Sequence, residues 1–372
     1  MGGSRVSFSP PAYPYARLDG LREVAGRHEG GVVDCSVGTP VDAPPGFVLE
    51  VLARAEGARG YPASFGSPSY RAAAAGWIAR RLGVDVSDDD VAACVGTKEF
   101  VATVAGYLHL RLTDRDSVLY PAISYPTYAM GAQLAGLRAV PVPVISGRLD
   151  LDAIASSDVE RALILWSNSP SNPTGHLDEL GAAAEWGRRH GILVASDECY
   201  SEFTWSSPPR SILQHGTEGV IAVHSVSKRS NLAGVRAGFY AGDHDTVAYL
   251  RAVRQHAGFM VAAPVQAAVT AAYGDDEHVD VQRARYRRRL EILSGALTAV
   301  GIDAPMPEGT FYLWAHRPAV DGWELARELA ERAGLLVSPG EFYGSEGSGH
   351  VRVALVQPDD AIERVVARLK AS

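Results

Sequence analysis

The 372-residue chain has few of the features that mark secreted, metal-binding or membrane proteins. Its three cysteines, Cys35, Cys94 and Cys199, show neither the spacing of zinc ligands nor a disulfide framework. No stretch approaches the ~18 consecutive apolar residues of a membrane span, and residues 1–18 lack the apolar run of a signal peptide. We therefore expect a cytoplasmic protein that binds no metal and no membrane.

Positive charge and nucleotide-binding loops are also scarce. The formal net charge of -8 argues against a nucleic-acid surface, which needs clustered lysines and arginines. The basic run at residues 283–289 lies in a helical pattern, so we predict a solvated helix face there. No Gly-x-Gly-x-x-Gly follows a strand and no Walker-type lysine loop is present, which weakens dinucleotide and triphosphate hypotheses.

What is present is a regular alternation of short apolar runs and longer helical patterns from about residue 88. This alternation predicts an α/β fold whose mostly parallel sheet has helices on both faces. The last third changes to an α+β pattern, so we expect a smaller second domain. The predicted units are an N-terminal arm of residues 1–36 that joins the small domain, a large domain of residues 37–275 and a small C-terminal domain of residues 276–372. The predicted strands of the large domain are residues 91–95, 117–120, 138–144, 162–166, 192–196, 220–224 and 238–241, and its helices include residues 98–110, 128–135 and 177–190.

Five polar tracts follow predicted strands. In open parallel sheets, binding sites form at the carboxyl ends of strands, so these tracts should converge on one edge. They are Gly96-Thr97-Lys98, Tyr125-Pro126, residues 168–175, Asp197-Glu198-Cys199-Tyr200, and Ser225-Val226-Ser227-Lys228.

Two residues in these tracts indicate the chemistry. Lys228 could serve as an amine nucleophile toward a cofactor aldehyde and then as a general base and acid. Asp197 follows the apolar run 192–195, and a carboxylate buried there requires a cation. A protonated pyridine nitrogen would meet that requirement, and a structural pairing with an arginine is the alternative.

Other groups suit a phosphate. Ser225, Ser227 and Arg236 can bind one, with Arg236 supplying a planar fork. Gly96-Thr97-Lys98 opens a predicted helix, whose free N–H groups favour an anion, although simple N-capping explains a Gly-Thr pair equally well.

Four further residues can contact an aromatic ring or a substrate. Asn172 and Tyr200 can donate to a ring oxygen, and Tyr125 can either stack on a flat ring or pack in the core. Arg352 lies between apolar residues of a predicted strand, which suits a substrate α-carboxylate unless that position faces solvent.

As a set, these motifs resemble the fold-type-I pyridoxal-phosphate (PLP) aminotransferases of class I and II. The resemblance rests on Asn172-Pro-Thr-Gly, Asp197-x-x-Tyr200, and Ser225-x-Ser-Lys228 with Arg236 eight residues on, and it covers nearly the whole chain. It implies a PLP cofactor, with Lys228 as its Schiff-base lysine, Asp197 as pyridinium partner, Asn172 and Tyr200 at the ring hydroxyl, and Tyr125 stacked on the ring.

The same resemblance implies the remaining contacts. The phosphate would be held by Gly96, Thr97, Lys98, Ser225, Ser227 and Arg236. Arg352 would bind the substrate carboxylate, helped by Asn172 and the Gly38 backbone. Tyr61 would reach the phosphate of the other subunit, which implies a homodimer with active sites at its interface.

Several segments are similar, at finer grain, to the actinobacterial N-succinyldiaminopimelate aminotransferases. This implies transfer of an amino group from glutamate to N-succinyl-2-amino-6-oxopimelate, in lysine and diaminopimelate biosynthesis. The chain departs from that group at Val235 and at residues 308–311, so a paralogue of specialised metabolism with another substrate remains open. The similar segments are residues 36–42, 96–99, 122–128, 168–175, 196–200, 228–234 and 339–344.

Proteins with other functions would carry the same motifs. A lyase, decarboxylase or oxidase would need the same cofactor contacts, because the cofactor carries the common chemistry. A non-enzymatic binding protein is the third hypothesis, and the presence of Lys228 argues against it. For the distal part of the substrate, Lys98, Arg229 and Arg59 are possible anion partners, although each also fits a surface charge.

Overall fold

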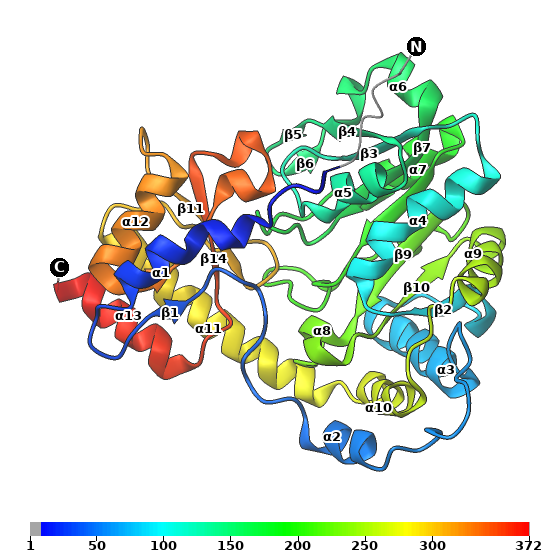
Figure 1. Ribbon diagram of the computed structural model, residues 1–372, viewed down its shortest axis with the longest axis horizontal. Coiled ribbons are helices and arrows are strands. Elements are labelled where there is room, and N and C mark those ends of the chain that lie inside the picture. The colour runs from blue at the N-terminus through cyan, green and yellow to red at the C-terminus, as the bar shows by residue number, and fades with distance from the viewer. Residues whose placement is uncertain (1–8, 372) are drawn as a thin grey trace.

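A seven-stranded sheet organises the larger lobe of the computed structural model, which describes residues 9–371 (Figure 1). Its strand order is β2-β10-β9-β8-β7-β3-β4, and only β10 runs antiparallel to its neighbours. The predicted α/β fold with a mostly parallel sheet is therefore confirmed. The strands are β2 (Val91–Cys94), β3 (Ser117–Pro121), β4 (Arg138–Val142), β7 (Ala162–Asn168), β8 (Leu193–Asp197), β9 (Val220–Ser225) and β10 (Gly238–Gly242).

Helices cover both faces of this sheet, as Figure 1 shows. Alternate residues of a strand point to opposite faces, so Val91 and Ala93 pack with one set of helices while Ala92 and Cys94 pack with the other. The first set is α3 (Pro68–Trp77), α7 (Leu180–His190) and α10 (Ala263–Tyr273). The second set is α4 (Thr97–Arg111), α5 (Thr127–Leu134) and α9 (His244–His256). Burial on both sides explains why these strands read as continuous apolar runs.

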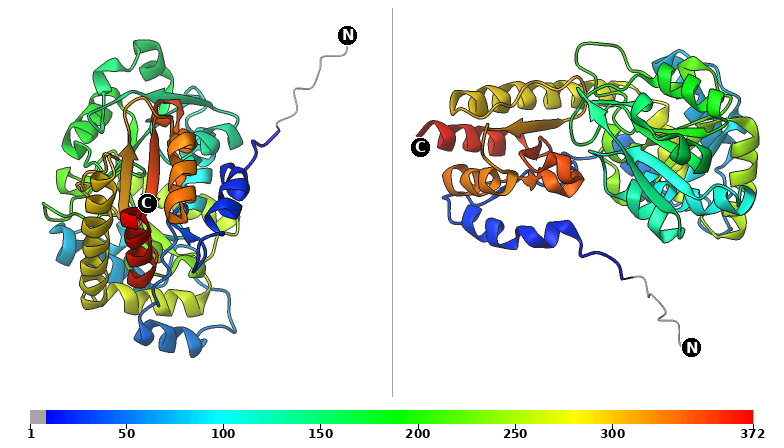
Figure 2. Two further views of the ribbon diagram at one scale, coloured as in Figure 1. Left: turned by 90° about the vertical axis from the view of Figure 1, so that its left-hand side faces the viewer. Right: turned by 90° about the horizontal axis from the view of Figure 1, so that it is seen from above.

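The smaller lobe combines the two ends of the chain (Figure 2). Its core joins Leu18 and Leu21 to residues of the last third, and the N-terminal β1 pairs in parallel with β12. This shared core supports the predicted arm and small domain, and the boundaries at residues 36 and 275 stay predictions. The elements are α1 (Asp19–Ala25), β1 (Val33–Asp34), α11 (Glu277–Ala299), β11 (Tyr312–His316), α12 (Gly322–Ala333), β12 (Leu335–Leu336), β13 (Ser338–Pro339), β14 (His350–Ala354) and α13 (Asp359–Ala371).

Two predicted elements differ from the structure. The strand expected over residues 138–144 ends at Val142, and Pro143 separates it from a small hairpin of β5 (Val144–Ile145) and β6 (Arg148–Leu149). The helix expected from residue 177 begins at Leu180, because the Leu177 and Asp178 amides donate to side chains of other segments. The other short helices are α2 (Gly46–Ala53), α6 (Ser156–Arg161) and α8 (Val226–Arg229). Within residues 9–371, no helix is long and apolar enough to cross a membrane.

The predicted solvated face at residues 283–289 is wrong at Arg289. This residue is 3% exposed, and its guanidinium lies 2.7 Å from the Asp42 carboxylate and 2.6 Å from the Asp359 carboxylate. Helical periodicity places Arg289 on the inner face of α11, where two acidic residues distant in sequence compensate its charge. Arg289 thereby ties α11 to the segment that leaves β1 and to the start of α13.

We predict that Arg289→Met lowers the free energy of unfolding by about 3 kcal/mol, because it leaves the Asp42 carboxylate buried without its cation. Urea unfolding at fixed protein concentration measures the change. The matched control is Arg287→Met on the same helix, which removes an exposed pair with Glu291 and should cost under about 1 kcal/mol. If both variants lost the same free energy of unfolding, the buried Arg289–Asp42 pair would not stabilise the fold more than the exposed pair does.

Candidate active site

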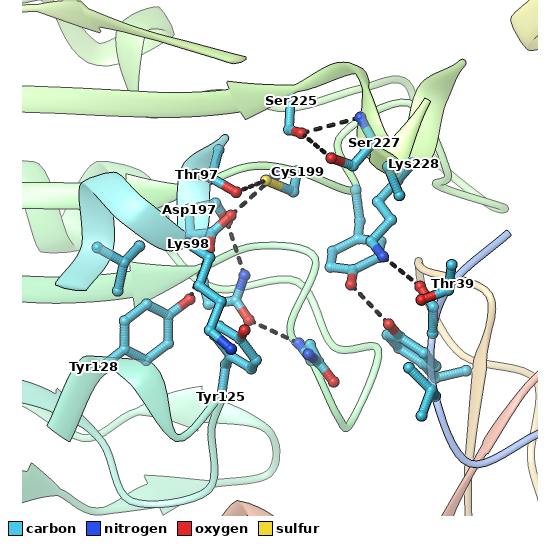
Figure 3. A pocket seen from close by; sticks show the side chains of 18 of the residues that line it. Thr39, Thr97, Lys98, Tyr125, Tyr128, Asp197, Cys199, Ser225, Ser227 and Lys228 are labelled. Atoms are coloured by element: carbon cyan, nitrogen blue, oxygen red, sulfur yellow. Dashed lines mark hydrogen bonds between the residues drawn. The ribbon is translucent and has the colours of Figure 1, made fainter. Parts of the chain in front are cut away.

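A cavity of about 420 Å³ opens where the carboxyl ends of β2, β7, β8 and β9 meet the smaller lobe (Figure 3). It brings together residues that the sequence predicted as one site. Those that line it are Gly38, Thr97, Lys98, Tyr125, Asn172, Asp197, Tyr200, Ser225, Ser227, Lys228, Arg236 and Arg352. Of the predicted set, Gly96 lies beneath Arg236 and Tyr61 lies away from the cavity. Among residues 9–371, no cluster of histidine, cysteine and acidic side chains has a metal-binding arrangement.

Lys228 extends from α8 into the cavity, and its Nζ donates a hydrogen bond to the Gly38 carbonyl. Burial lowers the pKa of Lys228 to about 8, because the charged ammonium loses its hydration. Near neutral pH the amine is therefore much more available than an exposed lysine, whose pKa is ~10.4. A lysine must be unprotonated to act as a nucleophile, so the lowered pKa suits Lys228 to that role.

Asp197, the last residue of β8, projects its carboxylate into the same cavity. It accepts hydrogen bonds from the Tyr128 hydroxyl at 3.1 Å and from the Cys199 amide at 3.2 Å. Burial raises the pKa of Asp197, while these hydrogen bonds and the field of His224 oppose the rise. No lysine or arginine in the described chain forms an ion pair with it, so the arginine-paired alternative fails. A ligand with a protonated ring nitrogen would satisfy this carboxylate.

Hydroxyl, guanidinium and helix-terminal groups also line the cavity. Ser225 Oγ donates to Ser227 Oγ at 2.7 Å and accepts from the Ser227 amide at 3.0 Å. Arg236 packs against Gly96 at the start of α4, where an added Cβ would lie 2.2 Å from the guanidinium. Gly96 has a φ of 76°, so glycine is needed for both conformation and space. This arrangement fits a phosphate group.

Arg352 enters the cavity from β14 and is 2% exposed, so the solvent-facing alternative is wrong. Its guanidinium donates to Asn172 Oδ1 at 2.8 Å and to the Ser36 carbonyl at 2.7 Å. It is sandwiched between Tyr312 and Tyr343, with ring centroids 4.2 and 4.8 Å from Cζ. All of these partners are neutral. A buried cation with only neutral partners can still bind a carboxylate.

Tyr200 and the Gly38 segment meet at Tyr312. The Tyr200 and Tyr312 hydroxyls are 2.7 Å apart, and burial raises the pKa of Tyr200 well above its ordinary value. An added Cβ on Gly38 would lie 2.0 Å from the Tyr312 hydroxyl. Gly38 therefore allows its backbone to approach Lys228 and Tyr312 together.

The structure gives contacts at the site to three residues that received no individual role in the sequence analysis, although Asn168 and Cys199 lie in its polar tracts. Tyr128 and Asn168 hold Asp197, since Asn168 Nδ2 donates to the Asp197 carbonyl at 2.8 Å and Asn168 Oδ1 accepts from the Asn172 amide at 2.7 Å. Cys199 Sγ lies 3.3 Å from Thr97 Oγ1. Tyr128 is three residues beyond Tyr125 at the start of a predicted helix, and this proximity to a strand end was the available signal.

Besides Gly96, three predicted residues do not line this cavity: Tyr61, Arg229 and Arg59, and Arg59 is exposed. Tyr61 is 98% exposed, as a residue that serves another subunit would be, and that role stays a prediction. Arg229, considered a surface charge or an anion partner of the substrate, is instead buried. Its guanidinium lies 2.5 Å from Glu202 and donates to the Ala272 carbonyl. The Glu202 carboxylate therefore compensates the charge of Arg229 inside the protein.

The donor set fits PLP. A carboxylate without a cation, an amine of lowered pKa and a serine–arginine anion site suit its ring nitrogen, aldehyde and phosphate. The model of the aminotransferase class I and II family matches residues 32–369, so the chain belongs to that family. It is thus an aminotransferase, and enzymes of this family use PLP.

Individual relatives agree with the family. A probable aminotransferase of Mycobacterium tuberculosis is 43% identical, over 98% of this chain and 86% of its own. The 4-dedimethylamino-4-oxo-anhydrotetracycline transaminase of Streptomyces rimosus is 41% identical, over 96% and 99%. The solved structure of a probable N-succinyldiaminopimelate aminotransferase from Thermus thermophilus is 31% identical, with a TM-score of 0.85 over 97% of this chain and 100% of that one.

The lowered pKa of Lys228 predicts how capture of PLP depends on pH. Below the pKa of about 8 the protonated amine does not attack an aldehyde, and above it the neutral amine does. When cofactor-free protein is mixed with PLP and trapped with borohydride, the initial labelling rate at Lys228 should rise through about pH 8. Peptide mass spectrometry measures the labelling, and Lys228→Ala serves as the control. A midpoint at the ~10.4 of an ordinary lysine would contradict the effect of burial.

Proposed function

We propose that the chain transfers an amino group from glutamate to a 2-oxo acid, with Lys228 as the residue that binds the cofactor aldehyde. The observation that carries this proposal is one cavity lined by Lys228, Asp197 and Arg352. The bound cofactor supplies an electron sink for the substrate α-carbon. Once the substrate amine has displaced Lys228, its free Nζ would take the proton from the α-carbon and deliver it to the cofactor carbon that had carried the aldehyde, so that water can release the 2-oxo acid while the nitrogen stays on the cofactor.

The remaining roles follow from position. Asp197 holds the protonated ring nitrogen, and Tyr200 and Asn172 donate toward the ring oxygen. Tyr125 stacks on the ring. The phosphate would lie against the backbone N–H groups of Gly96, Thr97 and Lys98 at the start of α4 and against the side chains of Ser225, Ser227 and Arg236. These assignments are supported by the placement of the side chains around one cavity and by the position of Gly96 at the start of α4.

For the substrate, Arg352 binds the α-carboxylate through its planar fork. Asn172 and Gly38 complete this end, because Asn172 already orients Arg352 and Gly38 brings its backbone beside Lys228. An α-carboxylate held at Arg352 would place the adjacent α-carbon near Lys228. This arrangement supports an amino acid or 2-oxo acid rather than a simple amine.

The acceptor we propose is N-succinyl-2-amino-6-oxopimelate, in lysine and diaminopimelate biosynthesis. Four cations line the cavity within the described chain: Lys98, Lys228, Arg236 and Arg352. With three of them assigned to phosphate, aldehyde and α-carboxylate, Lys98 remains for a carboxylate at the distal end. Its Nζ lies 5.6 Å from the ring centroid of Tyr13, at the side of the cavity formed by the N-terminal arm. The named Thermus relative supports the same acceptor.

A second acceptor class has its own support. Tyr13 and Tyr15, whose ring centroids are 5.4 Å apart, give the cavity an aromatic wall that suits a flat polycyclic ketone. The Streptomyces relative, at 41% identity, is named for a polycyclic substrate. The competing proposal is therefore an aminotransferase of specialised metabolism, in which Lys98 binds no distal carboxylate.

We also propose that the active unit is a cytoplasmic homodimer, in which Tyr61 of each subunit reaches the phosphate of the other. The near-complete exposure of Tyr61 supports this arrangement, because a large aromatic side chain so exposed suits an interface. Cys35, Cys94 and Cys199 carry free thiols, as a reducing compartment would maintain them.

We predict that L-glutamate converts the bound cofactor to its pyridoxamine form and releases 2-oxoglutarate, as followed by absorbance. Arg352→Met should lower kcat/KM for glutamate by roughly 100-fold, since a charge-assisted pair is lost. The kcat/KM of Arg352→Lys for glutamate should lie between that of the wild type and that of Arg352→Met. Arg287→Met is the surface control. Release of ammonia, carbon dioxide or peroxide without stoichiometric 2-oxo acid would instead indicate a lyase, decarboxylase or oxidase.

Lys98→Met separates the two acceptor classes. With the succinylated acceptor, kcat/KM of the second half-reaction should fall about 10-fold, because a distal carboxylate loses its cation. With pyruvate, which has no distal carboxylate, it should change less than about twofold. The measurement is the loss of the pyridoxamine band under single-turnover conditions. Equal effects on both acceptors, or turnover of only a polycyclic ketone, would contradict the proposed acceptor.

A further inference from the structure

Two polar residues lie behind the cofactor site, each next in sequence to a residue that lines it. Asp197 and Ser225 line the main cavity, while their neighbours Glu198 and His224 line a separate, smaller cavity. Successive residues of a strand point to opposite sides, which explains this division. Ser225 and Cys199 contribute to both cavities and form the wall between them.

Glu198 and His224 form a contact across two strands. Glu198 Oε2 lies 3.2 Å from His224 Nε2, and the two residues are 1% and 2% exposed. Glu198 Oε1 accepts from the Ile212 amide at 2.7 Å, and its backbone amide donates to the Val223 carbonyl at 2.9 Å. The pair therefore joins the carboxyl ends of β8 and β9, where Asp197 and Ser225 emerge.

The smaller cavity has a volume of about 10 Å³, which matches a single water molecule. Trp77 Nε1 and Tyr273 Oη, like Glu198 Oε2 and His224 Nε2, are buried and have no hydrogen-bond partner in residues 9–371. All four residues line this cavity. Leaving several such groups unpaired is costly, and one water could bond to most of them.

Neighbouring charges do not replace His224 as the partner of Glu198. Arg229 also lines the cavity, but it is held by Glu202 at 2.5 Å and stacks on Tyr273. Arg81 lies beyond it and pairs with Glu202 at 2.9 Å. The carboxylate of Glu198 has no other basic residue within ion-pair distance among the described residues.

We propose that Glu198 and His224, in contact with each other and with one bound water, act as positioning residues that fix Asp197 and Ser225 for cofactor binding. Neither residue touches the cofactor in this arrangement. The inference rests on the proposed cofactor roles of Asp197 and Ser225. Asp197→Asn tests those roles separately, because unchanged PLP affinity in that variant would overturn them whatever Glu198 and His224 do.

The main test measures the dissociation constant of PLP from cofactor-free protein for Glu198→Gln, His224→Gln and the double variant. Each single variant should bind PLP about tenfold more weakly, and the double variant no more weakly than either, since the pair acts as a unit. His244→Gln is the matched control, because it removes an exposed histidine contact with Asp90 at 2.6 Å. Binding within about twofold of wild type in both single variants would overturn the proposal.

A pH series separates positioning from simple packing. The field of His224 opposes the raised pKa of Asp197, so removing His224 should raise that pKa further. On acidification, His224→Gln should therefore lose PLP affinity at a higher pH than wild type does. Identical pH profiles would contradict the coupling to Asp197. A crystal structure at ~1.5 Å should show one water in the small cavity, and an empty cavity would overturn the water link.

If the two glutamine variants do not fold, Tyr273→Phe keeps the test available. It preserves the ring that packs in the core and removes only the hydroxyl that lines the small cavity. Thermal unfolding of the cofactor-free protein confirms that the variant folds. A roughly threefold weaker PLP affinity would support the water-linked pair, and unchanged affinity would contradict it.

Discussion

Asp197 carries a carboxylate into a cavity where no lysine or arginine of the described chain pairs with it, and much of the surrounding structure serves that charge. Tyr128 and the Cys199 amide donate to it, Asn168 fixes its backbone, and His224 lies behind it. A buried carboxylate is tolerated only when hydrogen bonds or a cation replace its hydration. A ligand with a protonated ring nitrogen would supply the cation that this carboxylate lacks.

The site also depends on both lobes, because each lobe contributes residues to the same cavity. Arg352 of the smaller lobe donates to Asn172 of the larger lobe, and Lys228 of the larger lobe donates to Gly38 in the connecting segment. Arg289 holds that segment through Asp42, four residues beyond Gly38. The proposed substrate end of the site thus depends on the relative position of the lobes, while most residues proposed to hold the cofactor follow strands of one sheet.

The grouping of most predicted residues around one cavity could be predicted from sequence, because alternating strands and helices bring the residues after each parallel strand to one edge of the sheet. Arg352 was also recognisable, since apolar neighbours on a strand imply burial. Tyr312 and Tyr128 were not, because an aromatic residue in a core segment looks the same whether or not its hydroxyl reaches a site. Arg289 was misjudged for a related reason. Periodicity can show which face of a helix is buried, but it cannot show that Asp42 lies against that face.

The acceptor is harder to infer than the cofactor for a related reason, because contacts between segments distant in sequence cannot be seen in a local pattern. The residues proposed to hold the cofactor come from compact motifs of a few residues each, whereas the wall proposed to face the distal part of the substrate combines Tyr13, Tyr15, Val37, Thr39 and Lys98 from three separate segments. Changing apolar or aromatic members of such a wall shifts discrimination by only about 1–3 kcal/mol, while a charge placed against a carboxylate can decide between acceptors. Lys98 is the one member of this wall with a formal charge. The choice between the proposed succinylated acceptor and a polycyclic ketone therefore depends on whether the Lys98 ammonium contacts the substrate or remains over the ring of Tyr13.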